Sequence, residues 1–356
     1  MKILITGVCG FVGSSLAQAF REENPGWSIS GIDNLSRPGS EQNRARLKTF
    51  GVKFIHGDVR SAVDIETLPA VDWVIDAAAN PSVLAGVEGA GSSRQIVEHN
   101  LGGTINLLEY CKRDRAGFIL LSTSRVYAIR PLATLELEVR DQAFHPKPGA
   151  TPAAGMSAAG ITEAFSTQPP LSLYGSTKLA SEYLALEYGE AFDFPVWINR
   201  CGNLAGAGQF GRSDQGIFAF WIHSYLRRTP LRYVGFGGKG HQVRDCLHPR
   251  DLFSLLAQQM SETEKTSPRI SNVSGGLTNS MSLAQLSDWC EARFGFRHEI
   301  GAERNGRVFD LPWVVLDSAQ AAREWKWRPR QPIASILEEI ALHAEQHPDW
   351  LERSRD

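Results

Sequence analysis

A tyrosine and a lysine four residues apart are the first residues of this sequence whose types and spacing could transfer a proton. Tyr174 and Lys178 lie in LSLYGSTKLASEYLALEYGE, whose pattern predicts an amphipathic helix over residues 171–190. Positions four apart share one helix face, so the hydroxyl and the ammonium can reach toward one point beside the helix. The spacing alone is equally compatible with a partly buried tyrosine beside a solvated lysine, so other parts of the chain must decide.

A glycine-rich turn near the start of the sequence could bind a pyrophosphate. Gly7, Gly10 and Gly13 in ITGVCGFVGSSLAQAF stand between a predicted first strand and a predicted first helix. Such a turn brings backbone N–H groups and the positive end of a helix up to a phosphate, and the missing side chains allow close approach. Asp33 ends the second predicted strand, about 20 residues further on, where an acid can bond the adenosine ribose of a dinucleotide.

Two charged residues near Asp33 bear on the choice of dinucleotide. Asp33 favours NAD, because a carboxylate would repel the 2′-phosphate of NADP, whereas Arg37 could pair with that phosphate. Asp58 in HGDVR follows the third predicted strand. It could contact the adenine or could be a solvated acid at a strand end.

Thr123 completes a set of residues suited to hydride chemistry. It lies in LLSTSRVY at the carboxyl end of the predicted fifth strand, where open α/β sheets bind ligands, so it could bond a substrate hydroxyl. A tyrosine with its ordinary pKa of about 10 is a poor base. The Lys178 ammonium and a positive nicotinamide would favour the Tyr174 phenolate, which could take a hydroxyl proton as hydride leaves the same carbon.

The elements that must position these residues alternate along the chain. Short apolar runs such as KILIT, SISGID, DWVIDAAA and GFILLSTS are separated by helical patterns, which predicts a Rossmann-type doubly wound parallel sheet. We expect this domain over residues 1–200, with a return of the chain to it around 243–275, and a smaller mixed substrate domain over 201–242 and 276–356. The Pro-, Gly- and Ala-rich excursion over 128–172 is a candidate functional loop, and covering a pocket is one role open to it.

Composition excludes several classes of protein. A net charge of -2 with scattered Lys and Arg shows no basic stripe for nucleic acid. Five separated cysteines without a CxxC pair indicate reduced thiols rather than disulfides or a metal site, and no apolar run suggests an export signal or a membrane span. We therefore expect a cytoplasmic protein with no nucleic-acid or membrane partner and no metal.

The combination of motifs resembles a known family. The glycine turn, Asp33, Thr123 and YGSTK look like the extended short-chain dehydrogenase/reductase family, which includes nucleotide-sugar epimerases and dehydratases. Within it, GVCGFVGSSLA, DNLSR, NRCGNLAG, SDQGIFAFW, GGKGHQVRDCLHPRDL and RVFDLPWVVLD are similar to the CDP-paratose 2-epimerase group. The resemblance implies NAD-dependent epimerisation of a nucleotide-diphosphate sugar, with C2 of a CDP-sugar favoured, by a homodimer or homotetramer.

The resemblance also implies a set of site residues. Asn203 and Gln209 would lie along the nucleotide-sugar site with Thr123 and Ser124, Arg244 and Arg307 would hold the diphosphate as bidentate guanidinium groups, and Asn100 would support the active-site backbone. His248 and Asp245 are expected to form a structural strand end. The NAD contacts are expected from Gly7, Cys9, Gly10, Phe11, Val12, Gly13, Asp33, Asn34, Ser36, Arg37, Asp58, Val59, Ala77, Ala78, Ala79, Asn100, Ser122, Tyr174, Lys178 and Arg200.

Four other functions compete with this interpretation. Family dehydratases carry an Asp-Glu pair after the catalytic threonine, and Ser124 and Arg125 stand here instead, which disfavours dehydration. A UDP-sugar 4-epimerase could use the same tyrosine with the sugar turned. An NAD(P)-dependent reductase could use the same residues but would exchange its cofactor. A dinucleotide-sensing protein without turnover would have no need of a base.

Overall fold

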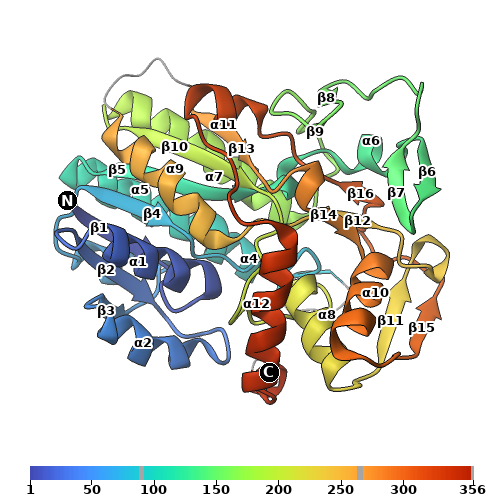
Figure 1. Ribbon diagram of the computed structural model, residues 1–356. Helices are drawn as coiled ribbons and strands as arrows, with labels where there is room; N and C mark the ends of the chain where they lie inside the picture. Colours follow the sequence, from blue (N-terminus) through green and yellow to red (C-terminus); the bar gives the residue numbers. More distant parts are fainter. Residues whose placement is uncertain (88–91, 263–267, 354–356) are drawn as a thin grey trace.

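The central sheet has seven parallel strands in the order β13-β10-β5-β4-β1-β2-β3. The computed structural model describes residues 1–87, 92–262 and 268–353 (Figure 1). The strands are β1 (Lys2–Thr6), β2 (Ser28–Asp33), β3 (Lys53–His56), β4 (Trp73–Asp76), β5 (Gly117–Thr123), β10 (Val196–Cys201) and β13 (Ile270–Val273). The predicted Rossmann-type doubly wound sheet is confirmed.

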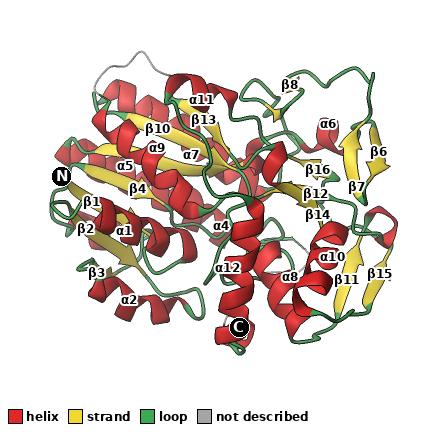
Figure 2. Cartoon of the chain, in the orientation of Figure 1, coloured by secondary structure: helices red, strands yellow, loops and turns green. Residues whose placement is uncertain are grey.

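Helices cover both faces of this sheet (Figure 2). One face is covered by α1 (Phe11–Glu23), α2 (Asn43–Thr49), α9 (Pro249–Ser261) and α11 (Ala319–Glu324), and the other by α3 (Ala62–Glu66), α5 (Gly103–Asp114) and α7 (Leu173–Ala191). A short helix, α4 (Ser93–Val97), contacts α7. Because successive side chains of a strand point to opposite faces, Trp73 and Ile75 of β4 join one core and Val74 joins the other.

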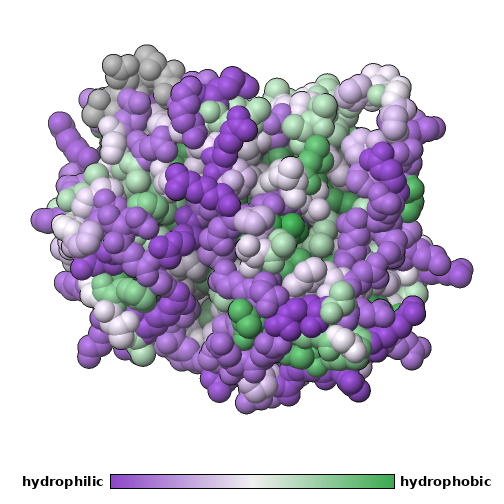
Figure 3. Space-filling view, viewed as in Figure 1, coloured by the Kyte–Doolittle hydropathy of each residue, from purple (hydrophilic) through white to green (hydrophobic). Residues whose placement is uncertain are grey.

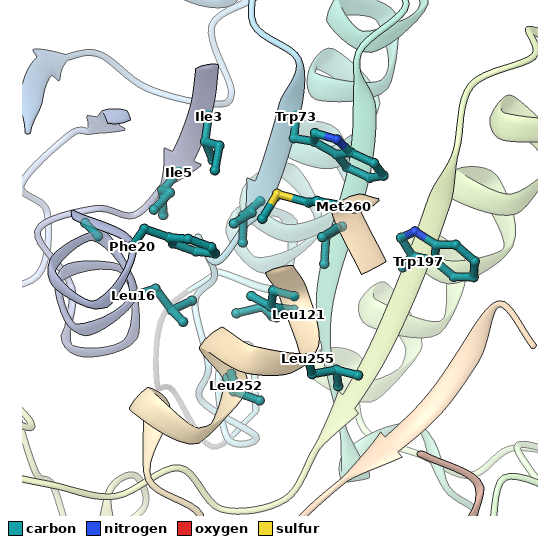
Figure 4. Close-up of a cluster of buried hydrophobic side chains, with 14 of the residues drawn as sticks. Ile3, Ile5, Leu16, Phe20, Trp73, Leu121, Trp197, Leu252, Leu255 and Met260 are labelled. Atoms are coloured by element: carbon teal, nitrogen blue, oxygen red, sulfur yellow. The ribbon is translucent and has the colours of Figure 1, made fainter. Parts of the chain in front are cut away.

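The core beneath α1 and α9 joins segments that are far apart in the sequence. Phe20 of α1 and Leu252, Leu255 and Met260 of α9 lie over the strands in Figure 4 and belong to one buried cluster with Ile5 of β1. Each fully buried side chain of this size contributes about 1.5–3 kcal/mol relative to exposure. The segment around α9 is thereby fastened to the face formed by the first strands.

A smaller group of elements lies beside the carboxyl ends of the sheet strands. It contains α8 (Ile217–Leu226), α10 (Leu283–Phe294) and α12 (Ile333–Gln346), which share a buried cluster, and the parallel pair β11 (Leu231–Val234) and β15 (Ile300–Glu303). A second small sheet orders β14 (Ser280–Ser282), β12 (Val243–Asp245) and β16 (Trp313–Val314). In Figure 1, α12 runs between the large sheet and the helices α8 and α10, and α13 (Trp350–Arg353) follows it.

The excursion over 128–172 forms regular structure. It contains α6 (Ile129–Ala133), the hairpin of β6 (Leu137–Arg140) and β7 (Ala143–Pro146), and the short pair β8 (Met156–Ser157) and β9 (Gly160–Ile161). Leu132, Ile161 and Phe165 pack in one buried cluster with Trp313 and Leu316. The excursion is thus anchored to the C-terminal part of the chain.

The surface seen in Figure 3 is largely hydrophilic, with hydrophobic side chains in small groups. Among the described residues, no helix is long and apolar enough to cross a membrane. All five cysteines are buried and free.

Candidate active site

A cavity of about 710 Å³ lies at the carboxyl ends of the sheet strands and reaches the smaller group of elements. It collects residues that the sequence places far apart, at the edge where open α/β sheets bind ligands. Its lining includes the following predicted site residues: Gly7, Gly10, Phe11, Val12, Gly13, Asp33, Asn34, Ser36, Arg37, Val59, Ala77, Ala78, Ala79, Ser122, Thr123, Ser124, Tyr174, Asn203, Gln209, Arg244 and Arg307.

The glycine turn between β1 and α1 leaves space for a ligand against the backbone. Gly7 has φ +61°, a left-handed conformation that favours glycine, and a Cβ on Gly13 would clash with the Gly7 carbonyl oxygen. Gly10 is the N-cap of α1 and provides no side-chain cap. The first N–H groups of α1 therefore face the cavity without a side chain over them, as anion binding at a helix start requires.

Asp33 ends β2 and contacts the backbone of this turn. Its carboxylate accepts hydrogen bonds from the backbone N–H groups of Cys9 at 2.9 Å and Leu35 at 2.8 Å. Burial raises the pKa of Asp33 above its usual value, and these backbone donors oppose the rise. Cys9 itself is buried outside the lining and acts here through its backbone N–H.

Arg37 and Asp58 have partners other than those considered from the sequence. The Arg37 guanidinium donates to the backbone carbonyl of Phe210 and, at 3.4 Å, to Gln215 Oε1, both on the opposite wall of the cavity. Asp58 lies outside the lining, accepts from Asn34 Nδ2 at 2.9 Å and pairs with Arg60 at 2.6 Å. Hydrogen bonding by Arg60 holds the Asp58 pKa well below its usual range. The adenine contact of Asp58 stays a prediction, and its carboxylate is held in place by Arg60 and Asn34.

Arg200 is placed away from the cavity, contrary to its expected place in the cofactor site. It is 4% exposed and pairs with buried Glu182 at 2.6 Å, because a buried guanidinium needs a carboxylate partner. Ser122 Oγ donates to the same carboxylate at 2.5 Å. This buried pair joins β10 to α7, the helix that carries Tyr174.

Asn100 supports the backbone near Tyr174 and does not line the cavity. Its Oδ1 accepts from the Asn80 N–H at 2.8 Å, and its Nδ2 donates to Thr177 Oγ1 at 3.1 Å. It lies in a π-helical turn, Glu98–Gly102, a feature often found at functional sites. The turn joins the loop after β4 to α7.

Thr123 and Tyr174 come together at the catalytic end, and Lys178 lies deeper. The α7 helix begins after Ser172, whose side chain accepts from the Gly175 N–H, so the cap sets Tyr174 in the first turn. Tyr174 is 9% exposed and lines the cavity, whereas Lys178 is 2% exposed and does not. Lys178 is therefore buried one turn along the helix from Tyr174 and lies outside the cavity lining, and its approach to the same point as the Tyr174 hydroxyl stays a prediction.

Burial dominates the protonation of this pair. It raises the pKa of Tyr174 to about 12, while a hydrogen bond with Thr123 and the charge of Arg125 act to lower it. Burial also lowers the pKa of Lys178, and the charges of Asp76 and Glu182 oppose that change. A positive charge near the Tyr174 hydroxyl is therefore needed for this residue to act as a base near neutrality.

The two arginines predicted to hold a diphosphate both line the cavity. Arg244 pairs with Asp310 at 2.8 Å, and Arg307 donates to the Ser213 carbonyl at 2.5 Å. Both guanidinium groups line the cavity and have further donors for phosphate oxygens.

Asn203 and Gln209 also line the cavity. The Asn203 N–H donates to Asp245 Oδ1, and Gln209 Nε2 donates to the Leu204 carbonyl at 2.7 Å. Asp245 is buried and also accepts from Ser274 Oγ and the Leu316 N–H, while His248 caps α9 and contacts Glu339. Asp245 and His248 therefore make structural contacts, as expected.

Two residues with charged partners at the site, Asp310 and Glu182, were not predicted from the sequence. Asp310 lines the cavity beside Arg244 and stands three residues after Arg307 in RVFD, a signal that was available. Glu182 follows Lys178 by four residues, so the helical spacing that joined Tyr174 to Lys178 extends one more turn.

The excursion over 128–172, for which covering a pocket is one open role, does not line this cavity. None of the described residues that line the cavity comes from this excursion. Its apolar side chains pack instead against Trp313 and Leu316.

Comparisons with known proteins agree with this geometry. A family model described as the NAD dependent epimerase/dehydratase family matches residues 3–274. The chain belongs to this family. CDP-paratose 2-epimerase of Salmonella typhi is 30% identical over 348 residues, which is 93% of this chain and 95% of that protein.

Two further family members have similar coverage. A dTDP-glucose 4,6-dehydratase of Streptomyces antibioticus is 28% identical over 94% of this chain and 89% of its own length. The structure of UDP-glucuronic acid 4-epimerase from Bacillus cereus in complex with NAD has a TM-score of 0.74 and 25% identity, and covers 98% of this chain and 97% of that one. The family resemblance expected from the motifs is confirmed, and the protein is an NAD-dependent enzyme of the nucleotide-sugar epimerase and dehydratase family.

The residues at the glycine turn fit the family's cofactor, NAD. The close backbone approach at Gly7 and Gly13 and the open start of α1 suit a pyrophosphate, and Asp33 suits a ribose hydroxyl. The carboxylate at position 33 disfavours a 2′-phosphate.

Proposed function

We propose that this enzyme epimerises a nucleotide-diphosphate sugar, with C2 of a CDP-sugar as the reacting centre. The observation that carries the proposal is the 30% identity to CDP-paratose 2-epimerase over 93% of this chain. The cavity residues support it, since a threonine, a tyrosine and two arginines line the same space.

In the proposed cycle, the Tyr174 phenolate takes the proton of the C2 hydroxyl, and Thr123 holds the sugar oxygen. NAD supplies the hydride acceptor and later the hydride donor. Lys178 contributes positive charge beneath the tyrosine, and Arg244 and Arg307 hold the diphosphate while the 2-keto sugar presents its other face. Tyr174 then returns the proton to the oxygen, giving the inverted alcohol with no net oxidation.

The two positions after Thr123 argue against dehydration. Water elimination needs an acid and a base placed beside the hydride site. Ser124 and Arg125 both line the cavity here, and neither can supply a carboxyl group. We therefore infer that this chain does not carry out the dehydration for which this relative is named.

A UDP-sugar 4-epimerase is the second candidate. It is favoured by the similarity to UDP-glucuronic acid 4-epimerase, with 25% identity and coverage of 98% of this chain. The same Tyr174 could serve C4 if the sugar were turned in the cavity.

Isotope tracing distinguishes these possibilities. The enzyme is incubated with CDP-, UDP- and GDP-sugars, and the products are analysed by mass spectrometry and sugar analysis. A C2-deuterated substrate, run in ordinary water, is expected to give an epimer that retains its deuterium at C2. Washout to solvent would indicate deprotonation at carbon, and epimerisation at C4 would favour the second candidate.

A further inference from the structure

Residues 209–215, here called the bridge segment, connect parts of the cavity that are predicted to bind different ligands. The segment has a glycine in the left-handed conformation on each side, since Gly208 has φ +76° and Gly216 has φ +64°. Its backbone closes one tight turn between Arg212 and Gln215 and forms no helix or strand. Contacts with other elements must therefore determine where it lies. The residues of the segment that line the cavity are Gln209, Phe210, Ser213, Asp214 and Gln215.

Two contacts fasten the bridge segment to loops on the cofactor side. Arg37, in the loop after β2, donates from its guanidinium to the Phe210 carbonyl and, at 3.4 Å, to Gln215 Oε1. Ser82, in the loop after β4, donates from Oγ to Asp214 Oδ2 at 3.0 Å. The same two loops supply several of the predicted NAD contacts that line the cavity. The position of the segment therefore depends on how these loops are held.

On the substrate side, the bridge segment contacts one of the arginines predicted to hold the diphosphate. Arg307 Nη1 donates to the Ser213 carbonyl at 2.5 Å, which fixes the guanidinium while leaving further N–H groups for phosphate oxygens. Each side is thus joined to the other through fewer than ten residues of chain.

Bound NAD should favour the fastened position of the bridge segment. Arg37 lines the cavity in the loop that follows Asp33, where the adenosine half of NAD is expected. Adenosine at this place would exclude water from the guanidinium and fix the loop, and hydrogen bonds are stronger in less polar surroundings. The fastened position also holds Arg307 for a diphosphate. Two ligands that favour the same conformation raise each other's affinity by the same factor.

We propose that the bridge segment couples the two halves of the cavity, so that bound NAD raises the affinity for a nucleoside diphosphate. Arg37 is the positioning residue of this device and acts through Phe210 and Gln215. The inference rests on the proposed function for the class of the second ligand.

The test measures the binding of CDP and of UDP to the full chain by calorimetry, with NAD removed and with NAD saturating. In the wild type, NAD should raise the affinity for the preferred nucleotide by about fivefold or more. In Arg37→Met this ratio of affinities should fall close to one, and the nucleotide should equally lose its effect on NAD binding. A merely structural loss would lower both affinities and leave their ratio unchanged.

Two further variants make the test specific. Asp214→Ala removes the acceptor of the Ser82 hydroxyl from the segment itself and should also lower the ratio, which keeps the test available if circular dichroism shows that Arg37→Met does not fold. Arg44→Met neutralises an exposed arginine of α2 outside the cavity lining and should keep the wild-type ratio.

The possible failures are distinguishable. Equal nucleotide affinities with and without NAD in the wild type would overturn the coupling and leave the proposed epimerisation untouched. An unchanged ratio in the folded Arg37 and Asp214 variants would overturn the role of the bridge segment. If neither CDP nor UDP bound to the NAD-saturated wild type, the proposed substrate class would fail, and the coupling with it.

Discussion

Trp350 donates a 2.9 Å hydrogen bond from its indole Nε1–H to the backbone carbonyl of Gln209, so the end of the described chain holds one wall of the cavity. The indole also stacks on Phe210, with centroids 5.1 Å apart and planes inclined by 16°. The Phe210 carbonyl accepts from Arg37 on the opposite side. Two cavity-lining residues are thus held between α13 and the segment after β2.

Loss of the indole donor should weaken substrate binding. Trp350→Phe keeps a ring against Phe210 and removes the N–H, so we expect KM for the nucleotide sugar to rise about fivefold, for a lost hydrogen bond of about 1 kcal/mol. The value of kcat and the affinity for NAD should change little. Steady-state kinetics and NAD titration measure these effects. Trp289→Phe, outside the cavity lining, is the control, and an equal rise in its KM would contradict the specific role of Trp350.

Tyr174→Phe should fold normally and bind NAD, because only a hydroxyl group is removed. Turnover should fall by about 100-fold or more, the contribution typical of a general base. Tyr183→Phe is a matched control, since Tyr183 lies on the same helix and is 56% exposed. Near wild-type turnover in Tyr174→Phe would exclude Tyr174 as the base.

Glu182→Gln should destabilise the fold more than it weakens cofactor binding. The change leaves Arg200 buried without its carboxylate partner, which costs about 3–5 kcal/mol in comparable buried pairs. Urea unfolding measures the free energy of unfolding, and NAD titration measures the affinity of the folded fraction. Glu187→Gln, an exposed position on the same helix, should have little effect. If this variant lost affinity for NAD without losing stability, the result would indicate that Arg200 contributes to cofactor binding.

Stability should fall in mild acid because of two histidines beneath the cavity wall. Burial lowers the pKa of His343 from 6.5 to about 4 and that of His223 to about 3. In this pH range the two histidines bind protons in the unfolded chain but not in the folded protein. The free energy of unfolding therefore falls as pH drops from about 6.5 toward about 4. Thermal unfolding across this range measures the slope. His343→Gln should reduce it, and His145→Gln should not; equal slopes in all three proteins would contradict the assignment.

Asp33 should give NAD an advantage over NADP. Its carboxylate can accept from a ribose hydroxyl and repels a 2′-phosphate, so titration of the stripped protein should show tighter binding of NAD. Asp33→Asn removes the negative charge and should reduce the difference between the affinities for NAD and NADP. Equal affinities of the wild type for NAD and NADP would indicate that Arg37 pairs with the 2′-phosphate, and would favour the reductase alternative.

Part of the site could be predicted because its signals are local. Gly7 follows a strand and precedes a helix, Gly13 lies in the first turn of that helix, and Thr123 ends an apolar run. Strand and helix periodicity therefore place them at the carboxyl edge of the sheet. The position of Tyr174 in the first turn of α7 follows from the Ser172 cap. Each of these assignments depends on neighbours within a few residues along the chain.

Other assignments required the partners that folding brings together. The sequence predicted that Arg200 contacts the cofactor. In the structure it is buried and forms an ion pair with Glu182. The side chain of Lys178 shares a helix with Tyr174, but its exposure depends on packing against β4 and β10, which no spacing within α7 specifies.

The sequence by itself determined the alternation of strands and helices up to Thr123, the glycine turn, the acid at position 33 and the residue types available for hydride chemistry, because these follow from periodicity and local backbone geometry. Only the tertiary structure decided that Asp310 pairs with Arg244 and that Trp350 holds the wall containing Gln209. The physical reason is that charge interactions and buried hydrogen bonds depend on distances across the fold, and those distances are set by how the sheet and its covering helices pack.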